Sequence, residues 1–118
     1  MIEVGGISIK VIKALGLTIS ANTPIYLGDS NIKHMKSRHP QDYAKYSAKI
    51  TNILAQPDYV ALNADGSLEY VKEFQIDNKY IKVAVRISTG GQYFARSLYS
   101  LNNNRVANFI KKGTLKPI

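Results

Sequence analysis

The chain changes its hydrophobic period once, near Pro57, and this change separates a mainly helical first half from a stranded second half. Before Pro57, apolar residues recur at steps of three and four, as they do on the buried face of a helix. After Pro57, apolar and polar residues alternate, as on a strand with one buried face. This order predicts an α+β fold, with N-terminal helices packed on one face of a curved antiparallel sheet and a short C-terminal helix.

The first half contains start and stop signals for helices. Ser8 is a good N-cap, and Gly16 is a good stop. Asp29 or Ser30 can cap a second helix, and Pro40 can begin a third. The predicted elements are a helix over 8–15, an extended segment over 19–27, a helix over 29–39 and a longer helix over 41–56.

Turn-forming residues divide the second half into strands. The turns are Asn63-Ala64-Asp65-Gly66, Asp77-Asn78 and Thr89-Gly90-Gly91. The alternation between them predicts strands over 59–62, 67–76, 79–88 and 92–101. The pattern also predicts a C-terminal helix over 102–112, with Val106, Phe109 and Ile110 facing inward and Gly113 ending the helix.

Length and composition limit the class of protein. The 118 residues suffice for a single domain over 1–118 with a real core. No window is apolar enough for a membrane span, and residues 1–17 lack the continuous apolar centre of a signal peptide. The chain has no cysteine and two histidines, so neither a disulfide scaffold nor a usual zinc site is expected. No cofactor is predicted.

The net charge of +8 is concentrated toward the C-terminus. Residues 1–78 carry equal numbers of acidic and basic residues, whereas residues 79–118 carry eight basic residues and no acid. Such one-sided charge indicates a polyanionic partner, nucleic acid first, or an acidic protein that covers the basic surface. A membrane surface fits less well, because no basic amphipathic helix with exposed large apolar residues stands out.

Both histidines lie in the stretch from Lys33 to Pro40, which also holds the permanent cations Lys36 and Arg38. A titrating side chain among fixed positive charges is the combination that cleaves a phosphodiester without a metal. The alternative is a solvated basic helix face with no chemistry.

Helical spacing assigns the two histidines to different faces. His39 shares a face with Ile32 and Met35, so it is expected to be structural. His34 lies four residues before Arg38 on another face, and it is expected to be the working histidine. The Arg38 guanidinium should lower the pKa of His34, because it opposes the charged imidazolium.

The strands over 79–88 and 92–101 predict a polar and basic sheet face. On the first strand, the residues opposite the apolar face are Tyr80, Lys82, Ala84, Arg86 and Ser88. On the second strand, alternation places Tyr93, Ala95, Ser97 and Tyr99 on one side and Phe94, Arg96 and Leu98 on the other. The first of these sides would extend the Lys82 and Arg86 surface, stack on bases and hold phosphate oxygens. Arg96 is expected in a structural ion pair or at the strand's end. The alternative is an ordinary half-exposed sheet face.

Several segments of the chain resemble the Barnase–EndoU–colicin–RelE superfamily of small ribonucleases, in particular the branch found in phage proteins and bacterial polymorphic toxins. These segments are residues 34–40, residues 53–60, the strand over 81–87, and Arg96-Ser97-Leu98-Tyr99 followed by Asn104-Arg105-Val106 and the basic tail. The likeness spans residues 7–118.

By position, the resemblance implies that His34 is the acid/base group, supported by Arg38 or Lys33, and that Ser97 and Tyr99 grip the scissile phosphate. The predicted catalytic residues are His34, Arg38, Arg86, Ser97 and Tyr99, with Arg86 assigned from the sheet face more than from the family. The predicted substrate-binding residues are Lys33, Lys36, His39, Lys82 and Arg96. No glutamate is expected on the sheet face where some relatives keep a carboxylate base, so His34 acts alone or with His39.

The resemblance implies a metal-independent endoribonuclease that cleaves tRNA by attack of a 2′-OH, such as the toxin domain of a contact-dependent growth inhibition protein. It also implies an acidic immunity protein as a partner and action in the bacterial cytoplasm. The chain is then either a small intracellular toxin or the C-terminal part of a delivered toxin or phage protein. A non-catalytic RNA-binding module and a basic adaptor domain that pairs with an acidic protein remain the alternatives.

Overall fold

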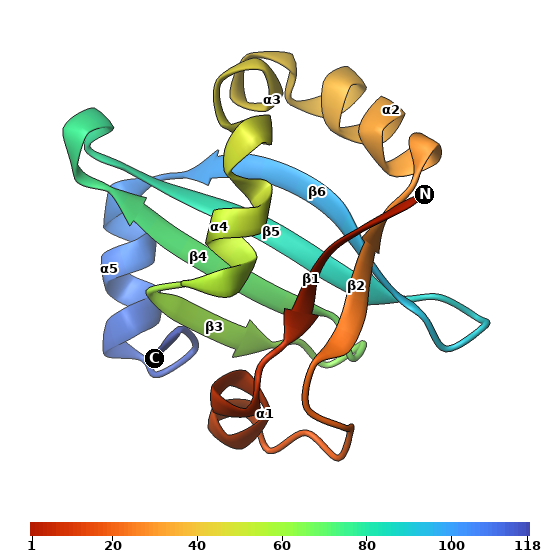
Figure 1. The fold of residues 1–118 in the computed structure, drawn as a ribbon. Coiled ribbons are helices and arrows are strands. Elements are labelled where there is room, and N and C mark those ends of the chain that lie inside the picture. Colours follow the sequence, from red (N-terminus) through yellow and green to blue (C-terminus); the bar gives the residue numbers. More distant parts are fainter.

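The computed structural model describes residues 1–118 and confirms the α+β fold (Figure 1). The helices are α1 (Ile9–Leu15), α2 (Asp29–Arg38), α3 (Pro40–Tyr46), α4 (Ile50–Ala55) and α5 (Asn103–Lys111), with 3₁₀ turns η1 (Ser47–Lys49) and η2 (Gln75–Asp77). The strands are β1 (Ile2–Ile7), β2 (Thr23–Leu27), β3 (Tyr59–Leu62), β4 (Leu68–Phe74), β5 (Lys79–Ile87), β6 (Tyr93–Leu101) and β7 (Lys116–Pro117). No helix is long and apolar enough to cross a membrane.

The strands form one sheet in the order β1-β2-β6-β5-β4-β3-β7. The predicted meander from β3 to β6 is confirmed, and its neighbours pair antiparallel. The expectation of a wholly antiparallel sheet is wrong at one place, because β2 pairs with β6 in parallel. Strand β1 was not expected. Its Gly5 and Gly6 interrupt the alternation, and a Cβ at Gly6 would lie 3.2 Å from the backbone of Asn22.

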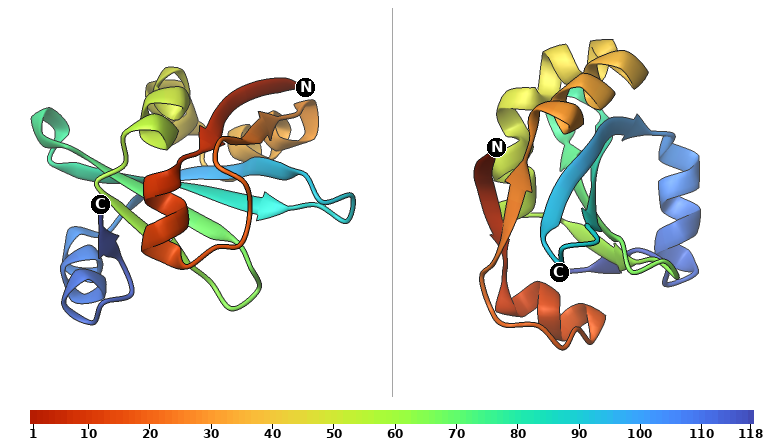
Figure 2. Two further views of the ribbon diagram at one scale, coloured as in Figure 1. Left: turned by 60° about the horizontal axis from the view of Figure 1, so that its bottom comes forward. Right: turned by 90° about the vertical axis from the view of Figure 1, so that its right-hand side faces the viewer.

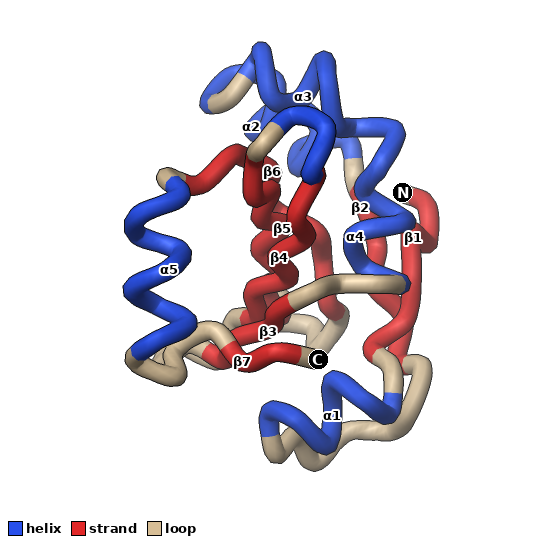
Figure 3. The backbone as a smooth tube through the Cα atoms, turned by 90° about the vertical axis from the view of Figure 1, so that its left-hand side faces the viewer, coloured by secondary structure: helices blue, strands red, loops and turns tan.

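The N-terminal helices pack on one face of the sheet, as the sequence predicts. Met35 from α2 and Ile53 from α4 are fully buried in the main core, together with Val83 of β5 and Leu98 of β6. Helix α5 covers the opposite face near β3 and β4, where Val106 packs in a separate small cluster. Figures 2 and 3 show α4 and α5 on opposite sides of the central strands. The part of this second face that α5 leaves uncovered is called the open face below.

Helices α2 and α3 lie along the outer edge of β6 (Figure 1). Strand β2, which also pairs with β1, contacts β6 only at the start of that strand, at Tyr93 and Phe94. Farther along β6, the carboxylate of Asp42 accepts hydrogen bonds from the backbone N–H of Ser100 at 2.9 Å and from its hydroxyl at 3.2 Å. These bonds satisfy one backbone N–H at the edge of β6 and tie α3 to this strand.

The helix boundaries agree with the sequence at α1 and differ at two other places. Gly28, rather than Asp29 or Ser30, is the N-cap residue of α2. The helix expected over 41–56 is divided into α3, η1 and α4. The Tyr46 hydroxyl donates to Asp77 at 2.7 Å, while α4 directs Ile53 into the core. A tight 3₁₀ turn between them changes the direction of the chain, so that both contacts form.

Candidate functional site

A β-bulge in β6 decides which side chains reach the open face. In the pairing of β5 with β6, Ala84 lies opposite Ser97 and Val85 lies opposite Ala95, so Arg96 is an extra residue. One extra residue reverses the alternation beyond it. The predicted common side of Tyr93, Ala95, Ser97 and Tyr99 is therefore wrong. Tyr93 and Ala95 belong to the main core, whereas Ser97 and Tyr99 lie on the open face beside Ala84 and Lys82.

The Arg96 side chain also differs from its prediction. It is exposed and forms no salt bridge, whereas an ion pair or a strand-end position was expected. With Arg86 and Phe94 it lines a pocket of about 360 Å³ that also includes Ser30 and Asn31, near the N-terminus of α2. The bulge thus adds a guanidinium to the open face.

His34 lies over the open face from the side of α2. It lines an open pocket of about 430 Å³ whose other residues are Arg38, His39, Ser97 and Tyr99. The next residue, Met35, is fully buried in the core and anchors the helix in this orientation. Two segments far apart in the sequence therefore supply one pocket, a basic helix and the strand that follows the bulge.

His39 is half-buried and lines this pocket, so it lies beside His34 and not on the buried face with Ile32 and Met35. Its ring stacks on Tyr99, with 4.6 Å between ring centroids and 25° between planes. The residue lies in the corner between α2 and α3, where Pro40 begins the new helix. Helical spacing could not show this, because His39 falls after the end of α2.

Electrostatics favour a neutral imidazole at position 34. Burial lowers the pKa of His34 below 6.5, and the positive charges of Arg96 and Arg38 lower it further, with His39 contributing as well. The sequence anticipated the effect of Arg38. It did not anticipate Arg96, because the bulge that brings this guanidinium to the open face leaves no simple pattern in the sequence. A neutral imidazole near pH 7 can accept a proton.

The predicted lysines occupy different places. Lys33 and Lys36 are exposed and do not line the His34 pocket, and the Lys36 ammonium lies 5.6 Å from the ring centroid of Tyr43. The Lys82 ammonium lies on the open face, 4.7 Å from the ring centroid of Tyr99. Only Lys82 is therefore next to the pocket.

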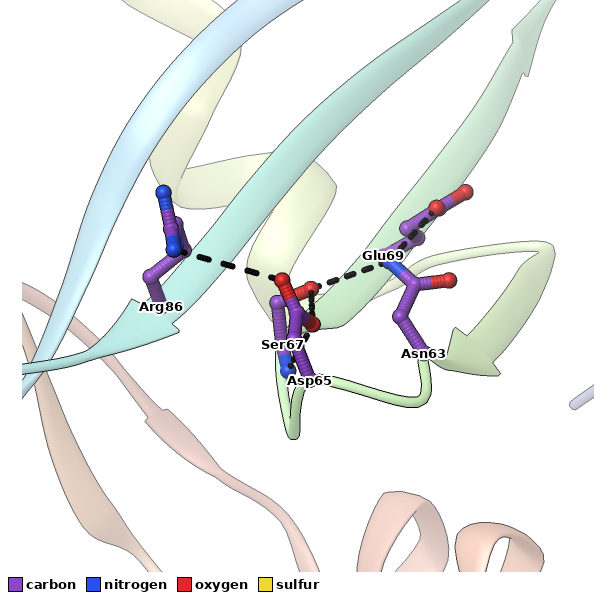
Figure 4. Close-up of polar contacts among 5 residues, drawn as sticks. All are labelled: Asn63, Asp65, Ser67, Glu69 and Arg86. Atoms are coloured by element: carbon purple, nitrogen blue, oxygen red, sulfur yellow. Dashed lines mark hydrogen bonds and ion pairs between the residues drawn. The ribbon is translucent and has the colours of Figure 1, made fainter.

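Arg86 lies on the open face but outside the His34 pocket. Its guanidinium is 4.0 Å from the carboxylate of Asp65 in the β3–β4 turn (Figure 4). The Ser67 backbone N–H and hydroxyl donate to Asp65 and lower the pKa of this carboxyl group. Of the predicted cations, Arg38 shares the pocket with His34, and Arg86 lies in the neighbouring pocket with Arg96.

A carboxylate missed by the sequence analysis also lies on this face. Glu69 of β4 is opposite Ala84, which is in turn opposite Ser97, so the expected absence of a glutamate is wrong. Its carboxylate accepts a hydrogen bond from the Asn63 side chain at 2.8 Å (Figure 4). The same carboxylate lies 3.6 Å from the Lys82 ammonium. The alternation of β4 carried the signal, since Glu69 follows the fully buried Leu68. Nowhere in residues 1–118 do three or more His, Asp or Glu side chains gather as metal ligands would.

Comparison with known protein families gives a match. The model of one family, described as phage-Barnase-EndoU-ColicinE5/D-RelE like nuclease, matches residues 2–108. The chain belongs to this nuclease family. Searches of curated proteins and of solved structures give no significant match. Membership of this family supports a nuclease function in general and implies a nucleic acid substrate.

Proposed function

We propose that this nuclease is a metal-independent endoribonuclease that cleaves by attack of a 2′-OH on the adjacent phosphate. The observation that carries this proposal is the single pocket formed by His34, Arg38, His39, Ser97 and Tyr99. It combines titrating rings, a fixed cation and hydroxyl donors, as the reaction requires.

In the proposed reaction, neutral His34 removes the proton of the 2′-OH. The 2′-oxygen then forms a bond to phosphorus, and the bond from phosphorus to the 5′-oxygen breaks. His39 protonates the departing 5′-oxygen, so the products are a 2′,3′-cyclic phosphate and a 5′-OH end. Acid/base assistance of this kind contributes about 10²–10⁴-fold to the rate.

Charge on the phosphate increases as the fifth bond forms, and the pocket offers groups to stabilise it. Arg38 and the hydroxyls of Ser97 and Tyr99 line the reaction pocket, and Arg96 is close enough to affect His34. The neighbouring Arg86 and Arg96 pocket fits a flanking phosphate, because two guanidinium groups meet hydroxyl side chains there. The RNA would then run along β6.

We propose tRNA as the substrate and the bacterial cytoplasm as the place of action, whether the chain is made there or delivered with a larger toxin or phage protein. The net charge of +8 favours an acidic immunity protein that covers the open face. Such a partner would compete with RNA, so adding it in excess should abolish both RNA binding and cleavage.

The test is cleavage of total tRNA by the purified protein in EDTA, with fragment ends mapped. The wild-type protein should give 2′,3′-cyclic phosphate ends and leave DNA intact, because DNA lacks the attacking hydroxyl. His34→Ala should lose about 10²–10⁴-fold of the rate while its fold and RNA affinity persist. Cleavage of DNA, or full activity of His34→Ala, would exclude this mechanism.

The competing function, an RNA-binding module without catalysis, uses the same open face. Its basic residues and the stacked His39 and Tyr99 rings would serve binding alone. The same experiment decides between the two, because that function predicts RNA retention by wild type and His34→Ala alike with no fragments from either.

A further inference from the structure

The corner between α2 and α3 places His39 at the joint of two helices. Its backbone N–H donates to the Met35 carbonyl at the end of α2, at 3.0 Å, and its carbonyl accepts from the Tyr43 N–H in α3, at 2.9 Å. The following Pro40 restricts this backbone further, and His39 lies outside the helical region at φ −141° and ψ 65°. The imidazole therefore moves with the two helices, and its place over the sheet depends on how α3 is held.

Apolar packing holds the end of α3 more firmly than its beginning. Tyr46, the last residue, is the only buried residue of this helix. At this end, the Lys45 ammonium and the Tyr46 hydroxyl also contact the carboxylate of Asp77 in η2, at 3.0 and 2.7 Å. The first residues of the helix, 40–42, are exposed or half-buried. The turn that follows His39 therefore needs a polar contact to fix it on the sheet.

Asp42 in α3 makes this contact with β6, which runs beside the helix (Figure 1). Its Oδ2 atom accepts from the backbone N–H of Ser100, at 2.9 Å, and from the hydroxyl of the same residue, at 3.2 Å. Asp42 forms no salt bridge, so no cation draws the carboxylate away from this strand. Hydrogen bonds to a carboxylate are among the stronger ones, and they have a defined length and direction. They fix the first turn of α3 along β6.

Two consecutive residues of β6 hold the ring and the helix together. Tyr99 stacks on His39, with 4.6 Å between ring centroids, and the next residue, Ser100, binds Asp42. A stacked ring can slide parallel to its partner, because offset arrangements are also favourable, whereas a hydrogen bond constrains length and angle. The stack therefore sets the tilt of the imidazole. The Asp42 contact sets how far along β6 the imidazole lies, beside Ser97 in the same pocket.

We propose that Asp42 is a positioning residue that holds the His39 imidazole where it can protonate the departing 5′-oxygen. This role rests on the proposed function, in which His39 is the general acid. A general acid must lie within hydrogen-bond distance of the atom that it protonates, and a displacement of about 1 Å can lower the rate roughly 10²-fold. Asp42 does not line the reaction pocket, so its effect on the reaction passes through His39.

The first experiment measures the position of His39 by NMR in the protein without RNA. Stacking on Tyr99 should shift the ring protons of His39 upfield, because these protons lie over an aromatic ring. Asp42→Ala should lose most of this shift as the imidazole leaves the stack. Asp77→Ala is the matched control, because it removes a carboxylate that ties the other end of the same helix, and it should keep the shift. An unchanged His39 shift in Asp42→Ala would overturn the proposal.

Asp42→Asn separates the contact from the charge of the carboxylate. Because one oxygen accepts both hydrogen bonds, the amide oxygen of asparagine can take its place without the negative charge. The His39 shift should therefore return in large part in Asp42→Asn. A shift as small as that of Asp42→Ala would show that the charge acts instead of the contact, and would overturn the positioning role.

Ser100→Ala gives the same test in a milder form if Asp42→Ala does not fold. It removes the hydroxyl donor at 3.2 Å and keeps the backbone donor at 2.9 Å. The His39 shift should then decrease in part, and an unchanged shift would count against the proposal.

The second experiment compares kcat and KM for RNA cleavage. Asp42→Ala should lower kcat roughly 10²-fold, because His39 no longer reaches the leaving oxygen. KM should change little, since the cations that bind RNA remain in place. Asp42→Asn should recover most of kcat, and Asp77→Ala should keep both constants. A raised KM with an unchanged kcat in Asp42→Ala would assign Asp42 to substrate binding and overturn the proposal.

The two experiments distinguish failure of the positioning role from failure of the proposed function. A His39 ring that moves in Asp42→Ala and returns in Asp42→Asn, in a protein that cleaves no RNA, would support the positioning contact and refute the ribonuclease function. Cleavage by the wild-type protein with an unmoved ring in Asp42→Ala would refute the positioning role alone.

Discussion

Strands β4, β5 and β6 present two faces that are made by neighbouring residues and have opposite properties. On the covered face, Val83, Val85 and Leu98 have 0% exposed surface. On the open face, Arg86 and Arg96 are exposed, and Ser97 is half-buried. The covered face fixes strand register, because a slip of one residue would exchange the faces. The open face is therefore able to hold polar groups that are not needed for stability.

The ion pairs of the open face are weak enough for a bound polyanion to replace them. The Lys82 ammonium lies 3.6 Å from Glu69, and the Arg86 guanidinium lies 4.0 Å from Asp65. Partly exposed ion pairs of this kind contribute about 0–1 kcal/mol. A polyanion can replace such contacts at little cost, whereas nothing replaces the covered face. Stability is concentrated on one face and chemistry on the other.

Inserting one alanine between Ser97 and Leu98 should disturb both faces at once and have the largest effect. One added residue reverses the alternation beyond it, so Leu98 would turn to the open face and Tyr99 toward the core. Exposing the leucine costs about 1.5–3 kcal/mol, and burying an unpaired hydroxyl costs about 1–3 kcal/mol, so the free energy of unfolding should fall by about 2.5–6 kcal/mol in total. Cleavage should disappear. Urea unfolding measures the first effect, and Arg96→Ala is the control that keeps the strand length. An insertion variant as stable as this control would show that the register after the bulge does not set the faces.

The bulge also marks the limit of what the sequence could predict. Local signals were sufficient where one residue type decides the structure, such as Ser8 and Gly16 at the ends of α1. The period of two gave the order of β3 to β6. An extra residue inside a strand has no such signal, since the residues on each side of Arg96 continue a plausible alternation.

The candidate site could also be predicted only in part, because local sequence signals locate some of its residues and not others. His34 and Arg38 share a face within one helix, so their proximity follows from spacing alone. Arg96 reaches the open face through pairing and register, and His39 reaches it through the corner between α2 and α3. Such relations are set by contacts between elements, which a single sequence does not display.

Leu98→Ala should test the covered face alone. Removing a fully buried leucine costs about 2–5 kcal/mol through lost transfer energy and the cavity that remains. The folded fraction should keep its cleavage rate per molecule at low temperature, since Leu98 points away from the pocket. A variant with normal stability and reduced cleavage would contradict the separation of the two faces. Urea unfolding and cleavage assays on the same preparation provide the comparison.

Ser97→Ala, one residue earlier, should reduce cleavage and leave stability almost unchanged. The hydroxyl lines the His34 pocket and has no hydrogen-bond partner within the protein, so its removal should change the free energy of unfolding little. Its proposed hydrogen bond to the phosphate is charge-assisted, and losing such a bond costs about 1.5–3 kcal/mol, or roughly 10–100-fold in kcat/KM. A rate equal to that of wild type would remove Ser97 from the proposed site.

The pH dependence of cleavage should depend on the Arg96 guanidinium, which the bulge places near His34. As the base, His34 must be neutral, so kcat/KM should rise with pH through its pKa, which lies below 6.5. Arg96→Ala removes one of the charges that oppose protonation, so the pKa should rise and the acid limb should move to higher pH. Lys10→Ala removes a charge of the same sign on α1, and should leave the limb in place. A limb that stays fixed in Arg96→Ala would exclude His34 as the titrating base.

Tyr70→Phe should give the smallest effect, and one of opposite sign. The Tyr70 hydroxyl is buried in the main core without a hydrogen-bond partner, and burial raises the pKa of Tyr70. Removing an unpaired buried hydroxyl should increase the free energy of unfolding by about 1 kcal/mol, with no change in cleavage. Tyr46→Phe is the matched control, because the Tyr46 hydroxyl donates to Asp77 and its loss should destabilise the protein. If Tyr70→Phe were also destabilised, the covered face would contain a polar interaction, and its contrast with the open face would be weaker.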